Sequence, residues 1–392
     1  MDRGTASAEG YDVVVVGGRV AGASTALLLA RAGHRVLVVD RVRFPADPLS
    51  THLIWPAGVL LLERWGLLDA VVASGAPALA TIRNDVDGLA FEVPVWPESG
   101  VTAVYAPRRT VLDPIVLQAA EEAGADVVEG VTVDGLARDA TGRVTGVVGH
   151  HDDGRPLHVE ARVVVGADGW RSRVAREAGA VAYDQRTASN AIHYAYWSGL
   201  DDRGVELWYR SAGGLMAGVF PTNDGACVYV NCRADRGPEI RRDLDAGYLR
   251  FIAEAAPDLA ARLATAHRTS TIRGTPGLPG FLRRPHGPGW LLVGDAGCHA
   301  DPASAHGITA ALRDAELAAV ALDVGLCEPE RADEAAAAFH EARDGSRPLY
   351  ELGWAMASYR WDLTGLLDLQ ASFAAELVRE ARETAALPAW SG

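Results

Sequence analysis

Apolar and polar positions near the start of the chain follow a strand–helix–strand order. The continuous run Val13–Val16 is β-branched throughout, which is typical of a parallel strand buried on both faces. The apolar stretch Ala23–Ala32 predicts a helix that ends at Gly33, and Arg35–Val39 predicts a second buried strand. Together these segments predict a βαβ unit, in which a helix connects two parallel strands.

Hydrophobic periodicity divides the remaining chain into two kinds of region. Fully apolar strands recur at 162–165 and 290–293, whereas the region from 180 to about 280 carries alternating segments that predict a half-buried antiparallel sheet. A helix is expected at 244–264 within that region. Further predicted elements are helices at 58–65, 112–123, 308–326, 331–343 and most of 350–386, and strands at 126–129, 132–136, 144–149 and 157–161.

Because the buried-type strands lie far apart in the sequence, one lobe must be assembled from discontinuous segments, with a second lobe inserted. The fold class is therefore α/β (α+β). The predicted division is a nucleotide-binding domain at 10–78, 100–180 and 285–330, a substrate-binding domain at 79–99 and 181–284, and C-terminal helices at 331–392.

The turn between the first strand and its helix has the character of a dinucleotide-binding loop. Gly17 and Gly22 frame it, and Asp40 follows Gly22 by 18 residues, near the spacing at which an acid reaches a ribose hydroxyl pair. A helix amino terminus presents free N–H groups and partial positive charge to a pyrophosphate. Arg19 stands where the motif usually has its middle glycine, so its side chain must either turn aside or add charge to the phosphates.

Composition excludes several functions. The 392 residues carry a net charge of −14, which argues against nucleic acid and anionic membrane surfaces as partners. All 37 basic residues are arginine, so lysine-dependent chemistry is excluded. The four cysteines show no C-x-x-C spacing, and the chain has neither an apolar signal core nor an unbroken apolar run long enough for a membrane span. We therefore expect a cytoplasmic protein with reduced thiols.

Two further motifs join the βαβ unit, namely VGADGWRSRV at 165–174 and LVGDAGCHADPASAHGITAALRDA at 292–315. In this order the three resemble the group A FAD-dependent monooxygenases, the p-hydroxybenzoate hydroxylase-like family, over roughly residues 10–345. The resemblance implies a Rossmann-like, GR2-type FAD-binding domain. The cofactor contacts expected on this basis are Gly17, Arg19, Val20, Ala21, Asp40, Arg41, Arg109, Val133, Asp168, Asp295, Pro302, Gly307 and Ile308.

The resemblance also implies a reaction. NAD(P)H reduces FAD, O2 adds to form a flavin C4a-hydroperoxide, and its distal oxygen hydroxylates or epoxidises an aromatic or polyketide-like small molecule. His52 is a candidate acid/base, and His306, where the family more often has Gly or Gln, is the second catalytic candidate. Substrate contacts are expected from Tyr194, Tyr196, Trp208, Met216 and Phe220, with His193, Trp197 and Tyr229 as further candidates.

Alternatives remain for several of these assignments. Asp168 and Asp295 could instead be helix N-caps, and each aromatic candidate could be an ordinary core residue. His299 and Asp301 offer two metal ligands with no third nearby, so no metal site is expected. Flavin halogenases need a lysine that this chain lacks. A reductase of the geranylgeranyl-reductase type, or a flavoprotein that sequesters an intermediate without turnover, would carry the same FAD motifs. The oligomeric state stays open.

Overall fold

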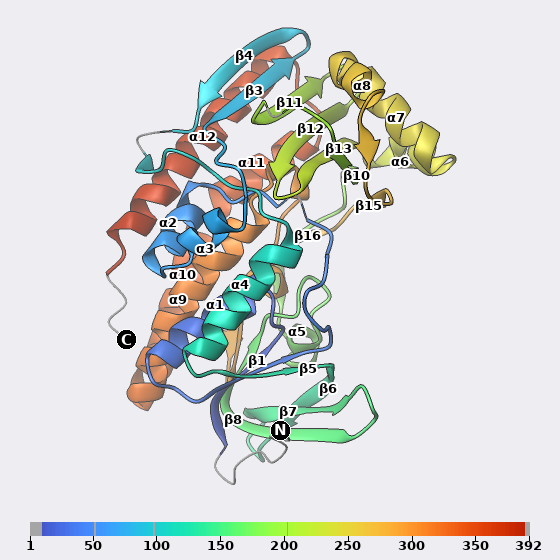
Figure 1. Ribbon diagram of the computed structural model, residues 1–392. Coiled ribbons are helices and arrows are strands. Elements are labelled where there is room, and N and C mark those ends of the chain that lie inside the picture. The colour runs from blue at the N-terminus through green and yellow to red at the C-terminus, as the bar shows by residue number, and fades with distance from the viewer. Residues whose placement is uncertain (1–9, 51, 97–98, 202, 389–392) are drawn as a thin grey trace.

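The computed structural model describes residues 10–388 except 51, 97–98 and 202. Two eight-stranded sheets, one above the other in Figure 1, form its framework, and a small three-stranded sheet lies beside them. The first sheet contains β17 (His286–Gly287), β18 (Trp290–Leu292), β8 (Pro156–Gly166), β1 (Tyr11–Val16), β2 (Val36–Asp40) and β5 (Asp126–Glu129) in that order, with β6 (Val131–Arg138) and β7 (Val144–His151) continuing from β8.

The first sheet is buried on both faces, as the apolar runs predict. Five of its strands, from β18 to β5, pair in parallel, with Val14 of β1 opposite Leu37 of β2 and Val164 of β8. Val13 and Val15 pack in one core with α1 (Val20–Arg31), α4 (Arg109–Glu122) and α9 (Gly307–Cys327). Val14 and its same-face neighbours pack instead against the β6–β7 meander. Because segments far apart in the chain supply adjacent strands, their carboxyl-end loops converge on one edge of the sheet.

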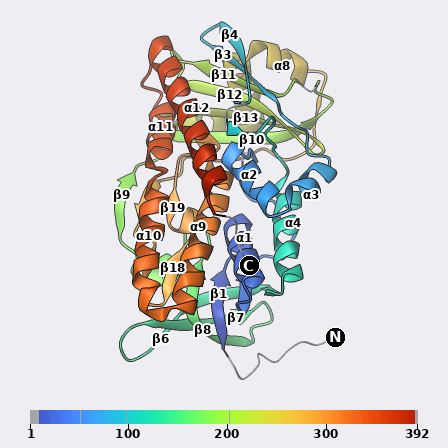
Figure 2. The ribbon, with the colours of Figure 1, turned by 90° about the vertical axis from the view of Figure 1, so that its left-hand side faces the viewer.

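The second sheet is also covered on both faces. It contains β14 (His267–Arg268), β10 (Asn190–Ser198), β13 (Gly225–Arg233), β12 (Leu215–Thr222), β11 (Val205–Arg210), β3 (Thr81–Val86) and β4 (Leu89–Pro94) in that order, with β15 (Arg273–Thr275) against β10. One face packs on α7 (Leu244–Ala255) and α8 (Pro257–Leu263). The other meets α11 (Arg347–Ala357) and α12 (Leu363–Ala386), which Figure 2 shows beside the sheet.

Two expectations for this region are wrong. The four strands β10 to β13 are not half-buried, since helices from two different parts of the chain cover both of their faces. The helix expected at 244–264 is two helices, because Ala256 leaves the helical conformation (φ −141°, ψ 76°) immediately before Pro257, which starts α8.

The remaining elements connect these layers. They are α2 (Pro56–Arg64), α3 (Leu68–Ala73), α5 (Arg173–Glu177), α6 (Gly237–Arg241) and α10 (Ala332–Asp344), short 3-10 turns among which η3 (Gly294–Ala296) and η4 (Pro302–Ser304) concern the site, and the small sheet of β19 (Cys298–His299), β16 (Gly280–Arg283) and β9 (Ala182–Arg186). Within the described residues, no helix combines the length and the apolar character that crossing a bilayer requires.

Candidate active site

A cavity of about 860 Å³ lies where the loops after β1, β2, β8 and β18 converge. Its wall contains all thirteen residues expected to contact a cofactor, although these residues are spread along the sequence from Gly17 to Ile308. The cavity also reaches the segment 48–50 and, in the second lobe, residues 274–276 at the end of β15. Its position at the carboxyl ends of parallel strands is where open α/β sheets bind their ligands.

The backbone of this cavity has the properties that a dinucleotide requires. A Cβ on Gly22 would lie 1.8 Å from the carbonyl oxygen of Gly17, and Gly17 itself has a positive φ of 111°. Only glycine fits such a turn, which keeps the chain close to whatever binds there. Of the described residues, none caps the start of α1 or of α9 with a side chain, so the free N–H groups of both helices are available to a ligand.

Arg19 turns aside from the position of the missing glycine. Its Nη1 lies 3.2 Å from Oδ2 of Asp113, a fully buried residue of α4 that Arg109 also holds, through Nε and Nη2 at 2.7 and 3.1 Å. Burial raises the pKa of Asp113, and the two guanidinium groups oppose that rise. The substitution is thus accommodated by one carboxylate that fixes two arginines in the cavity wall.

The three carboxylates expected in the cavity differ in their freedom to bind a ligand. Asp40 accepts N–H groups from Gly18 at 2.7 Å and Val42 at 2.8 Å, so it stabilises the loop as well as lining the cavity. Asp168 accepts two backbone N–H groups at the start of α5, as expected if its role were to cap that helix. Asp295 is exposed toward the cavity and is the most available of the three.

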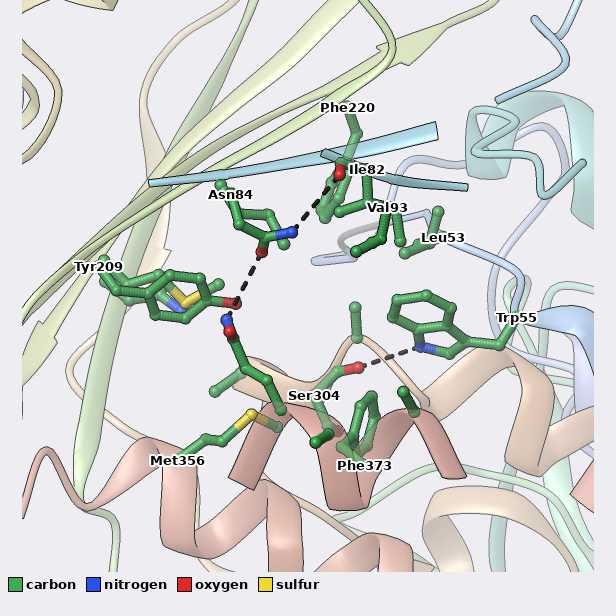
Figure 3. Close-up of a pocket in the computed structure, with 18 of the residues that line it drawn as sticks. Leu53, Trp55, Ile82, Asn84, Val93, Tyr209, Phe220, Ser304, Met356 and Phe373 are labelled. Carbon is green, nitrogen blue, oxygen red and sulfur yellow. Dashed lines mark hydrogen bonds between the residues drawn. The ribbon is translucent and has the colours of Figure 1, made fainter. Parts of the chain in front are cut away.

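A second cavity, of about 250 Å³, lies between the second sheet and α12 (Figure 3). Trp55 and Phe373 meet edge to face in its wall, with ring centroids 5.9 Å apart. Its wall is formed by Leu53, Trp55, Ile82, Asn84, Phe91, Val93, Trp96, Leu207, Tyr209, Met216, Phe220, Tyr229, Asn231, Pro302, Ala303, Ser304, Ala305, Met356, Leu367, Gln370, Ala371, Phe373 and Ala374. Two of these residues, Pro302 and Ala305, also line the first cavity.

The segment between the two cavities is held from several sides. Asp301 caps η4 by accepting the N–H of Ala303 and also accepts Nδ2 of Asn190 at 3.1 Å. Trp55 donates its indole N–H to the carbonyl oxygen of Ser304 at 3.0 Å (Figure 3). Ala305 then adopts a left-handed φ of 50°. This single turn therefore forms a fixed partition that presents one side to each cavity.

The structure brings only part of the predicted substrate set to the second cavity. Met216 and Phe220 line it. Tyr194 and Tyr196 lie on the same face of the sheet but outside the cavity wall. Trp208 packs on the opposite face, against α7 and α8, because strand alternation places it away from its neighbours Leu207 and Tyr209. The structure therefore places Trp208 away from the second cavity.

The two candidate catalytic histidines are placed differently. His52 is fully buried and lines neither cavity, and its Nε2 lies 2.6 Å from Oη of Tyr196. Burial, with nearby arginines, lowers the pKa of His52 to about 3. The structure therefore does not bring His52 to either cavity, and its acid/base role stays a prediction that this enclosed position does not favour. His306 does line the first cavity, and its Nε2 lies 2.8 Å from Oε2 of Glu380.

Sequence reasoning missed the residues that α12 and the β3–β4 hairpin contribute. Asn84, Gln370 and Phe373 line the second cavity, yet the sequence places their segments only in the substrate-binding domain and in a C-terminal helix. No local signal links them. Asp113 could have been found from the sequence, because it follows Arg109 by four residues on a helix, a spacing that predicts an ion pair.

Comparison with known proteins gives a family match, similar sequences and similar structures. The sequence model of the FAD binding domain family matches residues 10–343. A menaquinone reductase of Mycolicibacterium smegmatis is 30% identical over 331 residues, covering 80% of this chain and 76% of that protein. The crystal structure of Pseudomonas aeruginosa PqsL in complex with 2-aminobenzoylacetate is 26% identical with a TM-score of 0.74, covering 93% of this chain and 99% of that one. The flavin-dependent brominase Bmp2 has a TM-score of 0.79 at 19% identity, covering 94% and 93%.

Proposed function

Since the chain belongs to the FAD binding domain family and is an FAD-dependent oxidoreductase, we propose that it acts as a monooxygenase on a small organic molecule. In the net reaction, NAD(P)H supplies two electrons, one atom of O2 enters the substrate as a hydroxyl or epoxide oxygen, and the other leaves as water. When bound, FAD supplies the redox chemistry and the activation of O2 that protein side chains cannot provide.

The first cavity is the proposed FAD site. The Gly17–Gly22 turn and the start of α1 would hold the pyrophosphate, with Arg19 adding charge beside it. Asp40 would meet the adenosine ribose and Asp295 the ribityl chain. The start of α9 at Gly307 would stabilise negative charge on the ring system, and Arg109 would close the cavity from α4.

The observation that carries the proposal is the partition at Pro302–Ala305. Among the described residues, Pro302 and Ala305 of this segment line both the larger cavity, whose walls carry charged residues and glycines, and the smaller cavity, which is lined mainly by apolar and aromatic groups. A reaction that transfers oxygen from cofactor to substrate needs this arrangement, because substrate must lie beside the cofactor while water is excluded. Trp55, Phe220 and Phe373 supply the water-excluding surface.

The experiment is turnover by the purified yellow protein with heavy-oxygen-labelled O2. NADH and NADPH oxidation would be followed with and without a panel of phenols and aromatic ketones. We expect substrate-stimulated oxidation and one labelled oxygen atom in the product. Product that carries no label, or the absence of NAD(P)H oxidation with every compound, would contradict the proposal.

One specific observation favours a second candidate, a reductase. The menaquinone reductase above is a relative at 30% identity over most of both chains. A reductase would give a saturated product without labelled oxygen, so the same experiment separates the two. Halogenation is not proposed, because the whole chain contains no lysine and the likeness to the brominase is one of fold alone.

A further inference from the structure

We propose that Asn231 is the specificity-determining residue of the second cavity, where its side-chain amide pairs with the carbonyl or hydroxyl group of an uncharged substrate about the size of a bicyclic aromatic. This inference deepens the proposed function and rests on it, because it assumes that the second cavity receives the substrate. It draws on three properties of the cavity, namely its charge, its size and the pairing of its amides.

The wall of the second cavity is uncharged. Among the described residues that form it, none is Asp, Glu, Arg or His. The polar groups of the wall come from amides, tyrosine hydroxyls, indole N–H groups, one serine and the backbone. A carboxylate substrate would lose its hydration here without gaining a counter-ion, so the cavity selects against anions. The substrate class is therefore neutral.

The volume sets the size of the ligand. A protein cavity of about 150 Å³ binds benzene. At the same packing, the 250 Å³ of this cavity accommodates about ten ring atoms, which corresponds to two fused six-membered rings. The aromatic side chains of Trp55, Tyr209 and Phe373 around it suit a flat ligand.

The amides of the wall differ in whether they are already paired. Asn84 accepts a hydrogen bond from Gln370 at 3.5 Å and donates one to the carbonyl oxygen of Ile82 at 3.4 Å (Figure 3). Asn231 is 1% exposed, and neither its Nδ2 nor its Oδ1 has a hydrogen-bond partner among the described residues.

The surroundings of Asn231 explain why its amide lacks a partner. Its cross-strand neighbours are Met216 on β12 and Ile192 on β10, which offer apolar side chains. A buried amide without partners is costly, and proteins keep such groups where something else satisfies them. Because Asn231 belongs to the cavity wall, a ligand in the cavity can supply both an acceptor and a donor.

The test uses the FAD-loaded protein and two probes that differ in one group, 1-tetralone and its hydrocarbon analogue tetralin. Calorimetry or quenching of tryptophan fluorescence gives the dissociation constants, since Trp55 and Trp96 lie in the wall. We expect 1-tetralone to bind about 10- to 100-fold more tightly than tetralin, and Asn231→Leu to abolish that preference. The matched control is Asn84→Leu, which removes an amide that is already paired and should leave the preference in place.

Each outcome decides the proposal. Equal binding of the two probes by the parent protein, or a preference that survives Asn231→Leu, would overturn the role of Asn231, including the case in which its amide serves only to hold water. Binding of 1-naphthoate as tightly as 1-tetralone would overturn the neutral class. The thermal midpoint checks folding, and Asn231→Leu should not lower it, since it removes unpaired buried groups. Loss of oxygen transfer with the probe preference intact would contradict the proposed function alone.

Discussion

The two cavities are adjacent but are built in different ways. The first cavity, which is the proposed FAD site, is formed by turns that follow buried parallel strands, and its shape depends on backbone conformations at Gly17 and Gly22 that a Cβ would destroy. The second cavity is formed by side chains from five strands of the second sheet and from α11 and α12. One site is therefore specified by local motifs, whereas the other exists only after distant surfaces have packed together. Variants that damage one cavity and spare the other test this difference.

The largest expected effect comes from Gly22→Ala. The added Cβ would lie 1.8 Å from the carbonyl oxygen of Gly17 and 3.0 Å from the Cβ of Ala167, and neither atom belongs to a flexible side chain that could move aside. We expect the turn to open and FAD affinity to fall by more than 100-fold, measured as the flavin-to-protein absorbance ratio after gel filtration. Gly135→Ala is the matched control, because its Cβ would make only one ordinary contact, at 3.5 Å. Retention of flavin by Gly22→Ala would contradict the backbone account.

This difference between the cavities also explains what the sequence could predict. Apolar runs such as Val13–Val16 signal a buried parallel strand without tertiary information, and the loops after such strands converge by topology. The thirteen expected cofactor contacts consequently share one cavity wall, although their contacts with FAD stay a prediction. The residue boundaries of the two lobes also stay a prediction.

The second cavity could not be predicted in the same way. Alternation in β11 places Leu207 and Tyr209 on the face toward the second cavity and Trp208 on the opposite face. The sequence pattern would be the same if the strand were turned over, because its orientation is fixed only when α7 and α12 pack against the sheet. Gln370 and Phe373 come from a helix whose docking depends on long-range packing. Arg19 shows the converse case, since its departure from the motif is compensated by Asp113 from another helix.

A second prediction concerns α12, which lines the second cavity and also contacts His306 in the wall of the first cavity. Glu380 is buried and pairs with His306 in the wall of the first cavity, and Ser346 also donates to it at 3.1 Å. Burial would raise the pKa of Glu380, but His306 and Arg313 hold it below its ordinary value. Its stabilising contribution is therefore present at neutral pH and is lost as the pH falls through that lowered pKa.

We expect Glu380→Gln to lower the free energy of unfolding by about 3 kcal/mol at neutral pH, the low end for breaking a buried pair, because the amide keeps one hydrogen bond. Urea denaturation measures this change. Glu383→Gln on the same helix is the control, since Glu383 is half exposed and pairs with Arg379 on the surface, where about 0.5 kcal/mol is expected. Equal effects of the two substitutions would show that α12 is not anchored through His306.

A third prediction concerns His52, which lies in the sequence between Ser50 of the first cavity and Leu53 of the second cavity. The unfolded chain binds a proton at this imidazole near pH 6.5, whereas the folded protein does so only near 3. The contribution of His52 to the free energy of unfolding is thus fully present above pH 6.5. It falls as the pH decreases, by about 2 kcal/mol between pH 7 and pH 5.

The His52→Asn variant isolates this contribution, because asparagine tolerates the left-handed φ of 66° at this position. Urea unfolding at both pH values should show that the parent loses about 2 kcal/mol more than the variant does. An identical pH dependence in both proteins would mean that His52 becomes protonated in the folded state, and the region between the cavities would then be more open to water than its burial indicates.

The smallest expected effect, from Gly218→Ala, completes the comparison. A Cβ at this position in β12 would lie 2.5 Å from the ring and hydroxyl of Tyr229, whose ring stacks on Phe220 at 5.2 Å between centroids. Both aromatic side chains line the second cavity, so one added methyl group should displace two wall residues. We expect 1-tetralone to bind about tenfold more weakly, equivalent to about 1.4 kcal/mol, while flavin content stays at the parental level. Adding Tyr229→Leu to Gly218→Ala should restore room in the second cavity and part of the affinity for 1-tetralone.

Opposite results for Gly22→Ala and Gly218→Ala would separate a cavity whose shape is set by the backbone from one whose shape is set by side-chain packing. Loss of flavin in both variants would show that the two cavities form as one unit.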